Sequence, residues 1–544
     1  MARRKAKNDK TSSPARYDRG VTAYPPLIEA LRSPDAYPHP APDVELVQTH
    51  ISYVFLAGEY AYKVKRAVDF GFVDYSTLER RRAMCEAEVR LNRRLCPDAY
   101  LGVVPITHDG AAYRVGGQGA PVEYAVRMRR MPQERMLPAL LERGAAGAAE
   151  IRAIARDIAA FHARAETDAR IAAFGRVPGV RANIEENFAQ VAPFVGRTIA
   201  RERFDALHER AERFFARHGA LIEARADAGR VRDGHGDLRS DSIVLREDGS
   251  VCVMDCIEFN ERLRCGDVAS DLAFLAMDLD FRRFAPLADE LCAAYLDAAP
   301  DETLPAMLPF YRAYRAWVRG KVDCLLLDED DVPPPRRAEA EDRARRYFAL
   351  AARYPVPSAP AVVVMCGLSG TGKTWIATAA ACRLGAAWVS SDVARKELAG
   401  VPAARRLAAA YGEGVYTPEA RARVYAAMHG RARAHLAAGL PVVLDATYGD
   451  AARRAEAAAL AWEAGVPLVI AEVRASDDVV RAHLDARRAA GGGASDAGWS
   501  VYVAQRAGFS TPDAGERGTH VTLDGGASAA ESVRRILYAL GREG

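Results

Sequence analysis

Apolar and polar positions change their spacing along the chain. Strand-like runs dominate the first 130 residues or so, and HISYVFLAGEYAYKVKRAV at 50–68 predicts two strands joined at Ala-Gly-Glu. Helical patterns follow, interrupted at 242–256 by two apolar runs around an Asp-Gly turn, which predict a β-hairpin. A sheet followed by helices indicates a two-lobed α+β region.

A second region begins after a proline-rich break. YPVPSAP, at 354–360, holds three prolines in seven residues, and the apolar run AVVVMC then starts an alternation of strands and helices. This alternation predicts an α/β domain with a parallel sheet. We therefore expect a disordered basic tail at 1–18, an α+β domain at 19–353, a linker at 354–360 and an α/β domain at 361–544.

Composition narrows the class of protein. A chain of 544 residues is long enough for two or three domains, and a net charge of +3 gives no reason to expect a nucleic-acid partner. We find no apolar run that fits a signal peptide or a membrane span. The nine cysteines are scattered, and several, such as Cys252, Cys366 and Cys382, sit in apolar runs, so we expect reduced core thiols in a cytoplasmic protein.

The strongest motif is GLSGTGKT at 367–374, between an apolar strand and an alanine-rich helix. It fits the phosphate-loop pattern, in which backbone N–H groups and a helix N-terminus hold phosphate oxygens. Lys373 is expected to neutralise the terminal phosphates of ATP, and the Thr374 hydroxyl to bind Mg²⁺. The predicted nucleotide-binding residues are Gly367, Ser369, Gly370, Thr371, Gly372, Lys373 and Thr374.

Three later segments add candidate residues to this domain. Asp392 and Arg395 lie on one face of a starting helix, where the acid can meet an acceptor hydroxyl and the arginine can hold oxygens, or where the two can simply pair. Asp445 ends the apolar run PVVLD and is a candidate Mg²⁺ ligand. Arg487 lies on a helix before the glycines at 491–493, which suits a mobile lid over the phosphates or a solvated basic face.

The sequences GLSGTGKT, SSDVAR and VVLDAT resemble the P-loop kinases of small molecules, the branch with zeta-toxin-like and gluconate kinase-like proteins. The resemblance covers about 361–540 and implies a parallel sheet flanked by helices, with ATP and Mg²⁺ as cofactors. It leaves the acceptor open. An ATPase is a further alternative, although Ala446 and Thr447 stand where motor ATPases place a second acid.

The stretch HGDLRSDS, at 235–242, has the form of a kinase catalytic loop with a serine in place of the metal-binding asparagine. Asp237 is the candidate for contact with the substrate hydroxyl. Placing residue 247 opposite 250 in the hairpin sets Ser242 opposite Asp255. We therefore predict that Asp237, Ser242 and Asp255 converge on Mg²⁺, with Asp241 and Glu258 near enough to compensate for the weaker serine ligand.

A kinase also needs a lysine that a carboxylate holds in place. Lys63 lies inside the second predicted strand, with Lys65 on the same face, and Glu88 falls on an apolar helical stripe with Met84 and Leu91. A glutamate among apolar residues is costly unless it is paired. We therefore predict a Lys63–Glu88 ion pair that positions the nucleotide; Glu86 faces away from the stripe and is the less favoured partner.

Residues 45–330 resemble the aminoglycoside phosphotransferase, or choline-kinase-like, family, and the whole chain resembles bifunctional bacterial proteins that join such a domain to a P-loop domain. AYKVKRAVDFGF, DGHGDLRSDS and MDCIEFNERLR carry the likeness. It implies a catalytic role for Asp237, metal binding by Asp255 and a structural role for Asp271. The departures at Ser242 and Arg239, and the lack of a glycine-rich loop, leave two hypotheses: a weak or specialised kinase, or a non-catalytic nucleotide sensor that regulates the second domain.

Overall fold

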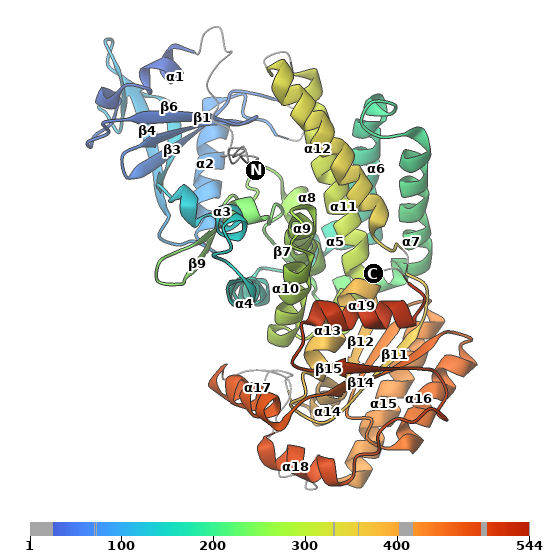
Figure 1. The fold of residues 1–544 in the computed structure, drawn as a ribbon. Helices are drawn as coiled ribbons and strands as arrows, with labels where there is room; N and C mark the ends of the chain where they lie inside the picture. The colour runs from blue at the N-terminus through green and yellow to red at the C-terminus, as the bar shows by residue number, and fades with distance from the viewer. Residues whose placement is uncertain are drawn as a thin grey trace, which may run out of the picture. The chain divides into compact units, whose positions relative to one another are not determined.

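The computed structural model describes residues 25–69, 71, 73–329, 332–356, 358–401, 417–490 and 498–542. The predicted tail at 1–18 and the glycines at 491–493 lie outside these ranges. The chain forms two compact units: unit 1 comprises 1–133, 252–261 and 329–336, and unit 2 comprises 134–251, 262–328 and 337–544. Figure 1 shows the elements of both units, which are described separately below.

Unit 1 is built on a six-stranded antiparallel sheet in the order β1-β2-β3-β6-β4-β5. The predicted strands joined at Ala-Gly-Glu are β2 and β3, and Gly58 adopts a φ of 58° in the turn between them. A core around Phe55, Tyr62 and Ile106 packs on one face of the sheet. The elements are α1 (Pro26–Ala30), β1 (Val44–Gln48), β2 (Ser52–Ala57), β3 (Tyr60–Lys65), α2 (Leu78–Asn92), β4 (Tyr100–His108), β5 (Tyr113–Val115) and β6 (Pro121–Arg129).

The predicted hairpin is present as β8 (Ile243–Leu245) and β9 (Val251–Val253). Its predicted register is wrong by one residue. The N–H of Gly249 donates to Arg246 O at 3.1 Å and that of Arg246 donates to Ser250 O at 2.9 Å, so Arg246 rather than Glu247 faces Ser250. Gly249, with a φ of 81°, is the extra residue of a glycine bulge, and a shift of one residue changes which side chains share a face.

Helices make up most of the first part of unit 2. The helix α9 is apolar around nearly its whole circumference and is buried on all sides, and the side chain of Asp267 caps its N-terminus. Two short strands, β7 (Val231–Asp233) and β10 (Cys265–Asp267), pair antiparallel. The helices are α3 (Leu137–Glu142), α4 (Ala148–Arg164), α5 (Ala169–Gly175), α6 (Val177–Val191), α7 (Arg201–Asp227), α8 (Glu261–Arg264), α9 (Val268–Phe281), α10 (Ala285–Ala298), α11 (Leu304–Leu325) and α12 (Pro334–Arg353).

The last part of unit 2 is the predicted α/β fold, a five-stranded parallel sheet in the order β12-β13-β11-β14-β15. Its apolar strands have helices on both faces, as parallel sheets require, with α13 and α19 packed together and α15 against α16 (Figure 1). The strands are β11 (Val362–Cys366), β12 (Ala387–Ser390), β13 (Val442–Asp445), β14 (Leu468–Arg474) and β15 (Thr519–Asp524). The helices are α13 (Lys373–Leu384), α14 (Ser391–Leu398), α15 (Pro418–Ala437), α16 (Ala451–Glu463), α17 (Asp477–Ala490), α18 (Trp499–Ala507) and α19 (Ala529–Ala539).

Helix α13 joins the two parts of unit 2. It packs on the parallel sheet and also contacts α10 and α11. At its C-terminal end the Arg383 guanidinium lies 2.6 Å from Asp289 and 3.4 Å from Asp280, two acids that are themselves almost fully buried. Paired charges of this kind fix the orientation of packed helices, because each is costly to bury alone. The predicted linker boundaries at 354 and 360 stay a prediction; α12 ends at Arg353 and β11 begins at Val362.

The prediction of reduced thiols is wrong for two of the nine cysteines. Cys96 and Cys252, both in unit 1, form a disulfide with their Cα atoms 4.8 Å apart. The two residues are 156 positions apart in sequence, so their spacing gave no sign that the fold brings them together. The other seven cysteines are free and buried, as predicted. No helix within the described ranges is both long and apolar enough to cross a bilayer.

Candidate nucleotide and phosphate sites

In unit 1 the predicted ion pair is present. The Lys63 ammonium on β3 donates to Glu88 Oε1 on α2 at 2.8 Å, and the Glu88 side chain is fully buried. Glu86, the less favoured partner, is exposed and pairs with Arg82 on its own helix. Burial acts to raise the pKa of Glu88, but the charges of Lys63 and Lys65 outweigh it and lower this pKa to about 2. Glu88 is therefore ionised at neutral pH.

Lys65 completes a buried cluster that the sequence only partly indicated. Its ammonium donates to Glu88 Oε2 and to Glu258 Oε1, and its side chain has no exposed surface. The Tyr75 hydroxyl donates to the same Glu258 oxygen at 2.7 Å. The sequence showed that Lys63 and Lys65 lie on one face of a strand. It did not show that Lys63 contacts Glu88 and Asp255, whereas Lys65 contacts Glu88 and Glu258. Glu258, considered as a compensating metal ligand, is the second carboxylate that binds Lys65; metal binding by Glu258 stays a prediction.

Asp255 occupies a strained position beside this cluster. Its backbone φ is 63°, which is unfavourable for a residue with a side chain. The Tyr100 hydroxyl accepts a hydrogen bond from its N–H at 3.2 Å, and the Lys63 ammonium donates to its carboxylate at 3.1 Å. The Asp255 side chain is 56% exposed, so its carboxylate stays accessible to a ligand. Strain of this kind that the surroundings maintain is typical of functional positions.

In unit 2 the catalytic-loop sequence is held by buried acids. Asp271 accepts hydrogen bonds from the backbone N–H groups of His235 at 2.7 Å and Gly236 at 2.9 Å. Arg315 on α11 donates to the Gly236 carbonyl at 3.0 Å. The sequence likeness assigned Asp271 the structural role of tying this loop to the helices, and these bonds confirm it. A carboxylate that satisfies two loop amides fixes the local backbone.

Asp237 and Ser242 are both engaged within this loop. Arg239 binds both carboxylate oxygens of Asp237, at 3.1 and 3.3 Å. Burial opposes ionisation of Asp237, but Arg239 and Arg319 outweigh it and lower its pKa to about 2. The Ser242 hydroxyl is buried, donates to Arg239 O at 2.7 Å and accepts from Arg239 N at 3.3 Å. It therefore caps the short helix η4 (Ser240–Ser242), and its only proton is already donated.

The predicted convergence of Asp237, Ser242 and Asp255 on one metal ion stays a prediction, because Asp255 belongs to unit 1 and the other two residues to unit 2. The register argument for it no longer holds, since the hairpin is shifted by one residue. Asp241 is half-exposed and pairs with Arg239 and Arg282.

The phosphate loop has the backbone that its glycines predict. Gly367, Gly370 and Gly372 have φ values of 140°, 86° and 89°, which side chains rarely tolerate. A Cβ atom on Gly367 would lie 2.5 Å from Val473 O, so the loop also needs a glycine there for space. The loop runs from the end of β11 into the N-terminus of α13, where free backbone N–H groups favour an anion.

The charged residues around this loop are brought together. Lys373 is buried and donates to Leu368 O at 2.7 Å. Burial lowers its pKa, while Asp445 and Asp392 act to raise it. Asp445 ends β13; burial raises its pKa, against the charge of Lys373 and hydrogen bonds from Thr374 and Trp388. The two predicted Mg²⁺ ligands, Thr374 and Asp445, are thus close enough for Thr374 to act on the pKa of Asp445.

Asp392 and Arg395 lie at the start of α14 as predicted, and they form an ion pair with each other. Asp392 is also close enough to Lys373 and Asp445 to shift their pKa values, so it borders the phosphate loop. Arg487 on α17 likewise acts on Lys373, and its Nη1 atom is buried without a hydrogen-bond partner among the described residues. The charge of Arg487 also acts to lower the pKa of Asp297 on α10, but its Nη1 atom is left without a hydrogen bond in the described part of the chain, which fits an anionic ligand near the phosphate loop.

These observations fit a magnesium-bound nucleotide. The positive-φ glycines leave the loop open to phosphate oxygens, and Arg487 offers an unused donor. Within the described ranges, no group of three or more acidic, histidine or cysteine side chains is placed so that it could hold a metal ion by itself. A nucleotide-bound Mg²⁺ needs only one or two protein oxygens, because phosphates and water supply the others. Thr374 and Asp445 are the residues that would hold it.

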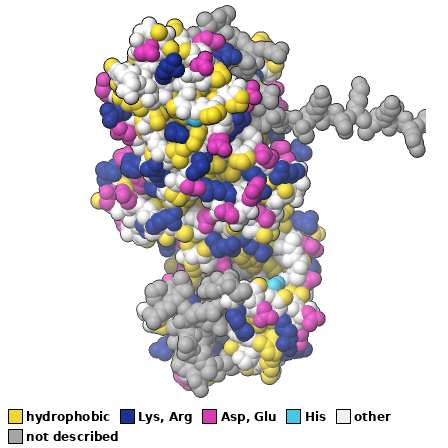
Figure 2. Space-filling model, turned by 90° about the vertical axis from the view of Figure 1, so that its left-hand side faces the viewer, with side chains coloured by type: hydrophobic (Ala, Val, Ile, Leu, Met, Phe, Trp, Pro, Cys, Tyr) yellow, Lys and Arg dark blue, Asp and Glu magenta, His cyan; other side chains and the backbone are white. Residues whose placement is uncertain are grey.

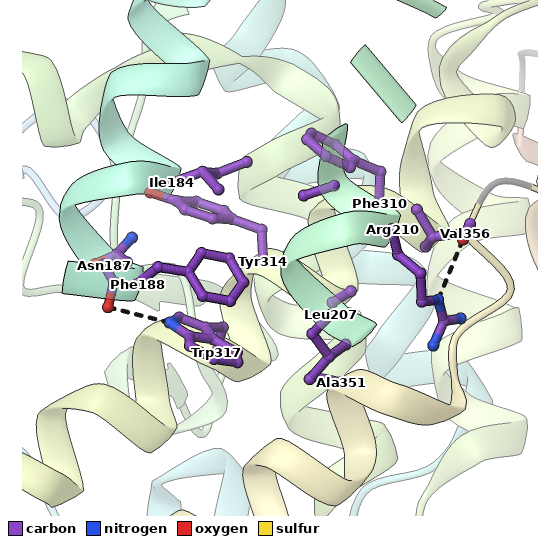
Figure 3. Close-up of a pocket in the computed structure, with 12 residues that line it drawn as sticks. Ile184, Asn187, Phe188, Leu207, Arg210, Phe310, Tyr314, Trp317, Ala351 and Val356 are labelled. Carbon is purple, nitrogen blue, oxygen red and sulfur yellow. Dashed lines mark hydrogen bonds between the residues drawn. The ribbon is translucent and has the colours of Figure 1, made fainter. Parts of the chain in front are cut away.

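A separate cavity of unit 2 lies among α6, α7, α11 and α12 (Figure 3). Its wall is mainly apolar and aromatic, with the rings of Phe188 and Trp317 4.0 Å apart. Arg210, its charged lining residue, turns to backbone carbonyls and donates to Ala352 O at 2.8 Å and Val356 O at 3.2 Å. None of the described residues that line it is acidic. This cavity therefore lacks the groups that phosphoryl transfer requires.

Two family models match two separate regions of the chain. The family model described as phosphotransferase enzyme family matches residues 77–310, and the model described as AAA domain matches residues 362–512. A choline/ethanolamine kinase family protein from Mesorhizobium loti is 14% identical, over 60% of this chain and 97% of its own, with a TM-score of 0.36. A gluconokinase from Sinorhizobium meliloti is 23% identical, over 34% of this chain and 93% of its own, with a TM-score of 0.25.

Mycobacterial proteins match most of this chain. The uncharacterized protein Rv2004c of Mycobacterium tuberculosis is 31% identical over 482 residues, which span 88% of this chain and 93% of that protein. The uncharacterized protein Mb2027c of Mycobacterium bovis matches to the same extent. In this chain the phosphotransferase-family region comes first and the P-loop region second. The chain therefore belongs to the family of these mycobacterial proteins and unites a phosphotransferase-family region with a P-loop kinase-like region.

Proposed function

We propose that the P-loop region is an ATP- and Mg²⁺-dependent kinase that phosphorylates a hydroxyl group of a small molecule. The arrangement of Lys373, Thr374, Asp445 and Asp392 around one loop supports this most directly. It combines a phosphate-binding cation, two oxygen ligands for Mg²⁺ and a carboxylate that can meet a hydroxyl. Bound Mg²⁺ would offset the negative charge on the phosphates.

In this proposal Asp392 orients the acceptor hydroxyl and takes up its proton. The acceptor oxygen forms a bond to the γ-phosphorus while the bond from that phosphorus to the β–γ bridging oxygen breaks, giving ADP and a phosphate ester. Lys373 and Arg487 stabilise the charge that moves to the bridging and peripheral oxygens. Asp392 first has to share or release Arg395, its partner in the present structure.

For the phosphotransferase-family region we propose nucleotide binding with weak or specialised kinase activity. The Lys63–Glu88 pair and the accessible carboxylate of Asp255 support nucleotide binding. A second candidate is a non-catalytic nucleotide sensor. It is favoured by the bidentate hold of Arg239 on Asp237 and by the commitment of Ser242 to the backbone of Arg239.

Lys373→Ala and Asp237→Asn in the full-length chain, singly and together, test these proposals. ATP consumption is measured against a panel of sugars, polyols and amino alcohols. We expect Lys373→Ala to reduce the main acceptor-dependent consumption by roughly 10³-fold, in line with the loss of a charged transition-state contact. Unchanged consumption in this variant would contradict the P-loop assignment.

The Lys373→Ala chain also separates the two candidates for the first region. Residual turnover that Asp237→Asn removes identifies a kinase. Binding of ATP without Mg²⁺ and without turnover identifies a sensor. Titration with ATP in the presence and absence of Mg²⁺, followed by calorimetry, distinguishes these outcomes.

A further inference from the structure

Helices α17 and α18 contact the phosphate loop directly. Leu368 of the loop packs into an apolar cluster formed by Val480, Leu484 and Tyr502. The His483 ring nitrogen Nδ1 lies 3.0 Å from Gly370 O. A Cβ atom on Gly370 would lie 2.8 Å from Val480, so the helix and the loop are in close contact. The loop is thus held from outside by side chains of these two helices.

One peptide group of the loop connects Lys373 to α18. The carbonyl of Leu368 accepts from Lys373 Nζ at 2.7 Å, and the N–H of the same peptide group, which belongs to Ser369, donates to Gln505 Oε1 at 2.9 Å. Lys373 is the cation expected at the terminal phosphates. Gln505 therefore lies one peptide group away from the cation at the γ end of the site.

Only the oxygen of the Gln505 carboxamide takes part in this hydrogen bond. Its oxygen accepts from Ser369, and its NH₂ group makes no hydrogen bond to any residue that the structure describes. The buried Nη1 of Arg487, which also acts on Lys373, is a second donor without a partner in the described part of the chain. Two unused donors beside one lysine favour an anionic ligand, because donors in such a place gain most from a charged acceptor.

We propose that Gln505 is a γ-phosphoryl-binding residue of the P-loop region. The Ser369 N–H holds its carbonyl, and this bond directs the NH₂ group toward a γ-phosphoryl oxygen. The inference rests on the proposed ATP-dependent kinase and adds a residue to its site. Gln505 should therefore contribute to the affinity for ATP, which has a γ-phosphate, and not to the affinity for ADP, which has none.

Gln505→Glu separates the two functions of the side chain. The glutamate still accepts from Ser369 N–H but has no NH₂ donor and brings a negative charge. Gln505→Ala removes both functions. Val503→Ala, an exposed position on the same helix, is the matched control. All three are made in the full-length chain with Asp237→Asn, which removes turnover by the first region. The nucleotide binding that remains in a Lys373→Ala, Asp237→Asn chain is assigned to the first region and subtracted.

The readout is the affinity for a non-hydrolysable ATP analogue compared with that for ADP, together with kcat and KM. We expect Gln505→Glu to weaken binding of the analogue by about 10–100-fold, the worth of a hydrogen bond to a charged group, and to leave ADP binding within about twofold. Retained ADP binding also shows that the variant is folded. Gln505→Ala should weaken the analogue less, since it adds no charge, and Val503→Ala should change neither affinity.

Equal weakening of both nucleotides would make Gln505 a structural residue only, and unchanged affinity of Gln505→Glu for the analogue would also overturn the inference. A parent chain that binds no ATP would instead refute the proposed function itself. Normal parent binding with indifferent Gln505 variants would refute the inference alone.

Discussion

The two phosphate-handling regions hold their key lysines in different ways. In unit 1 Lys63 is fixed by the carboxylate of Glu88, 25 residues away on another element. In unit 2 Lys373 is fixed by the backbone carbonyl of Leu368, five residues away in the same loop. Neighbouring carboxylates raise the pKa of Lys63 against the effect of burial, whereas burial prevails and lowers the pKa of Lys373.

This difference separates a site stabilised by charge pairs from one stabilised by loop geometry. The lysine cluster of unit 1 forms where β3 packs against α2. Each buried charge there is stable only because its partner of opposite charge is present. The hydrogen-bond partner of the lysine in unit 2 is a neutral carbonyl, so within the residues that the structure describes no carboxylate bonded to its ammonium group competes with a phosphate for it. Changes in the partners should therefore damage the first region through stability and the second through ligand binding.

The largest expected effect is on the stability of unit 1. Glu88→Gln removes the anion that Lys63 and Lys65 share and should lower the free energy of unfolding of unit 1 by roughly 3–5 kcal/mol. Hydrogen exchange of the amides in α2 and β3 reports this locally. Glu86→Gln, on the exposed face of the same helix, is the control and should change stability by less than about 0.5 kcal/mol. Equal effects of the two variants would contradict the buried-cluster interpretation.

The next effect is a dependence on pH. The pKa of Glu88 falls from 4.5 to about 2 on folding, so its contribution is fully present above about pH 4.5 and is lost as the pH falls toward 2. This contribution amounts to about 3 kcal/mol. Urea unfolding of the wild type followed between about pH 6 and pH 2 should show this loss, and the Glu88→Gln variant should show a flatter profile over the same range. Parallel profiles would mean that Glu88 is not the responsible group.

The smallest effect concerns the loop around Lys373. Leu368→Ala leaves the carbonyl that binds Lys373 but removes the side chain that packs against Val480 and Leu484. We expect a loss of about 1–2 kcal/mol in ATP affinity, since the side chain is only partly buried, with little change in global stability. Calorimetric titration of the Asp237→Asn chain with ATP measures it, after the binding that remains when Lys373→Ala is added has been subtracted. A large drop in melting temperature would instead show that this loop, like unit 1, is stabilised mainly by its packing.

The same contrast explains what could be predicted from the sequence. The loop at 367–374 is local, so its glycines, Lys373 and Thr374 were identified correctly as a strand-to-helix turn before the fold was known. Asp392 and Asp445 followed from their positions at strand ends, where side chains of a parallel sheet gather. The Lys63–Glu88 pair was found because a glutamate on an apolar stripe needs a partner.

Long-range contacts were missed or displaced for physical reasons. The disulfide of Cys96 with Cys252 and the contact of Gln505 with Ser369 join residues far apart in sequence, and no local pattern marks them. The hairpin at 242–256 was identified, but Gly249 adopts a bulge that an Asp-Gly pair alone does not distinguish from a two-residue turn.

Figure 2 shows basic and acidic side chains interspersed on one face, in agreement with the small net charge.

Helix α13 has a practical consequence for dissecting this protein. It carries Lys373 at its first position and is buried along most of its length, covered by the sheet on one side and by α10 and α11 on another. If a cut within 354–360 separated the two parts, it would expose this apolar surface. It would also take Arg383 away from the buried Asp289, and Asp280 would keep its ion pair with Arg312. The truncated fragments are therefore expected to aggregate. The activity of each region is better measured in the intact chain, with the other region inactivated by a single substitution.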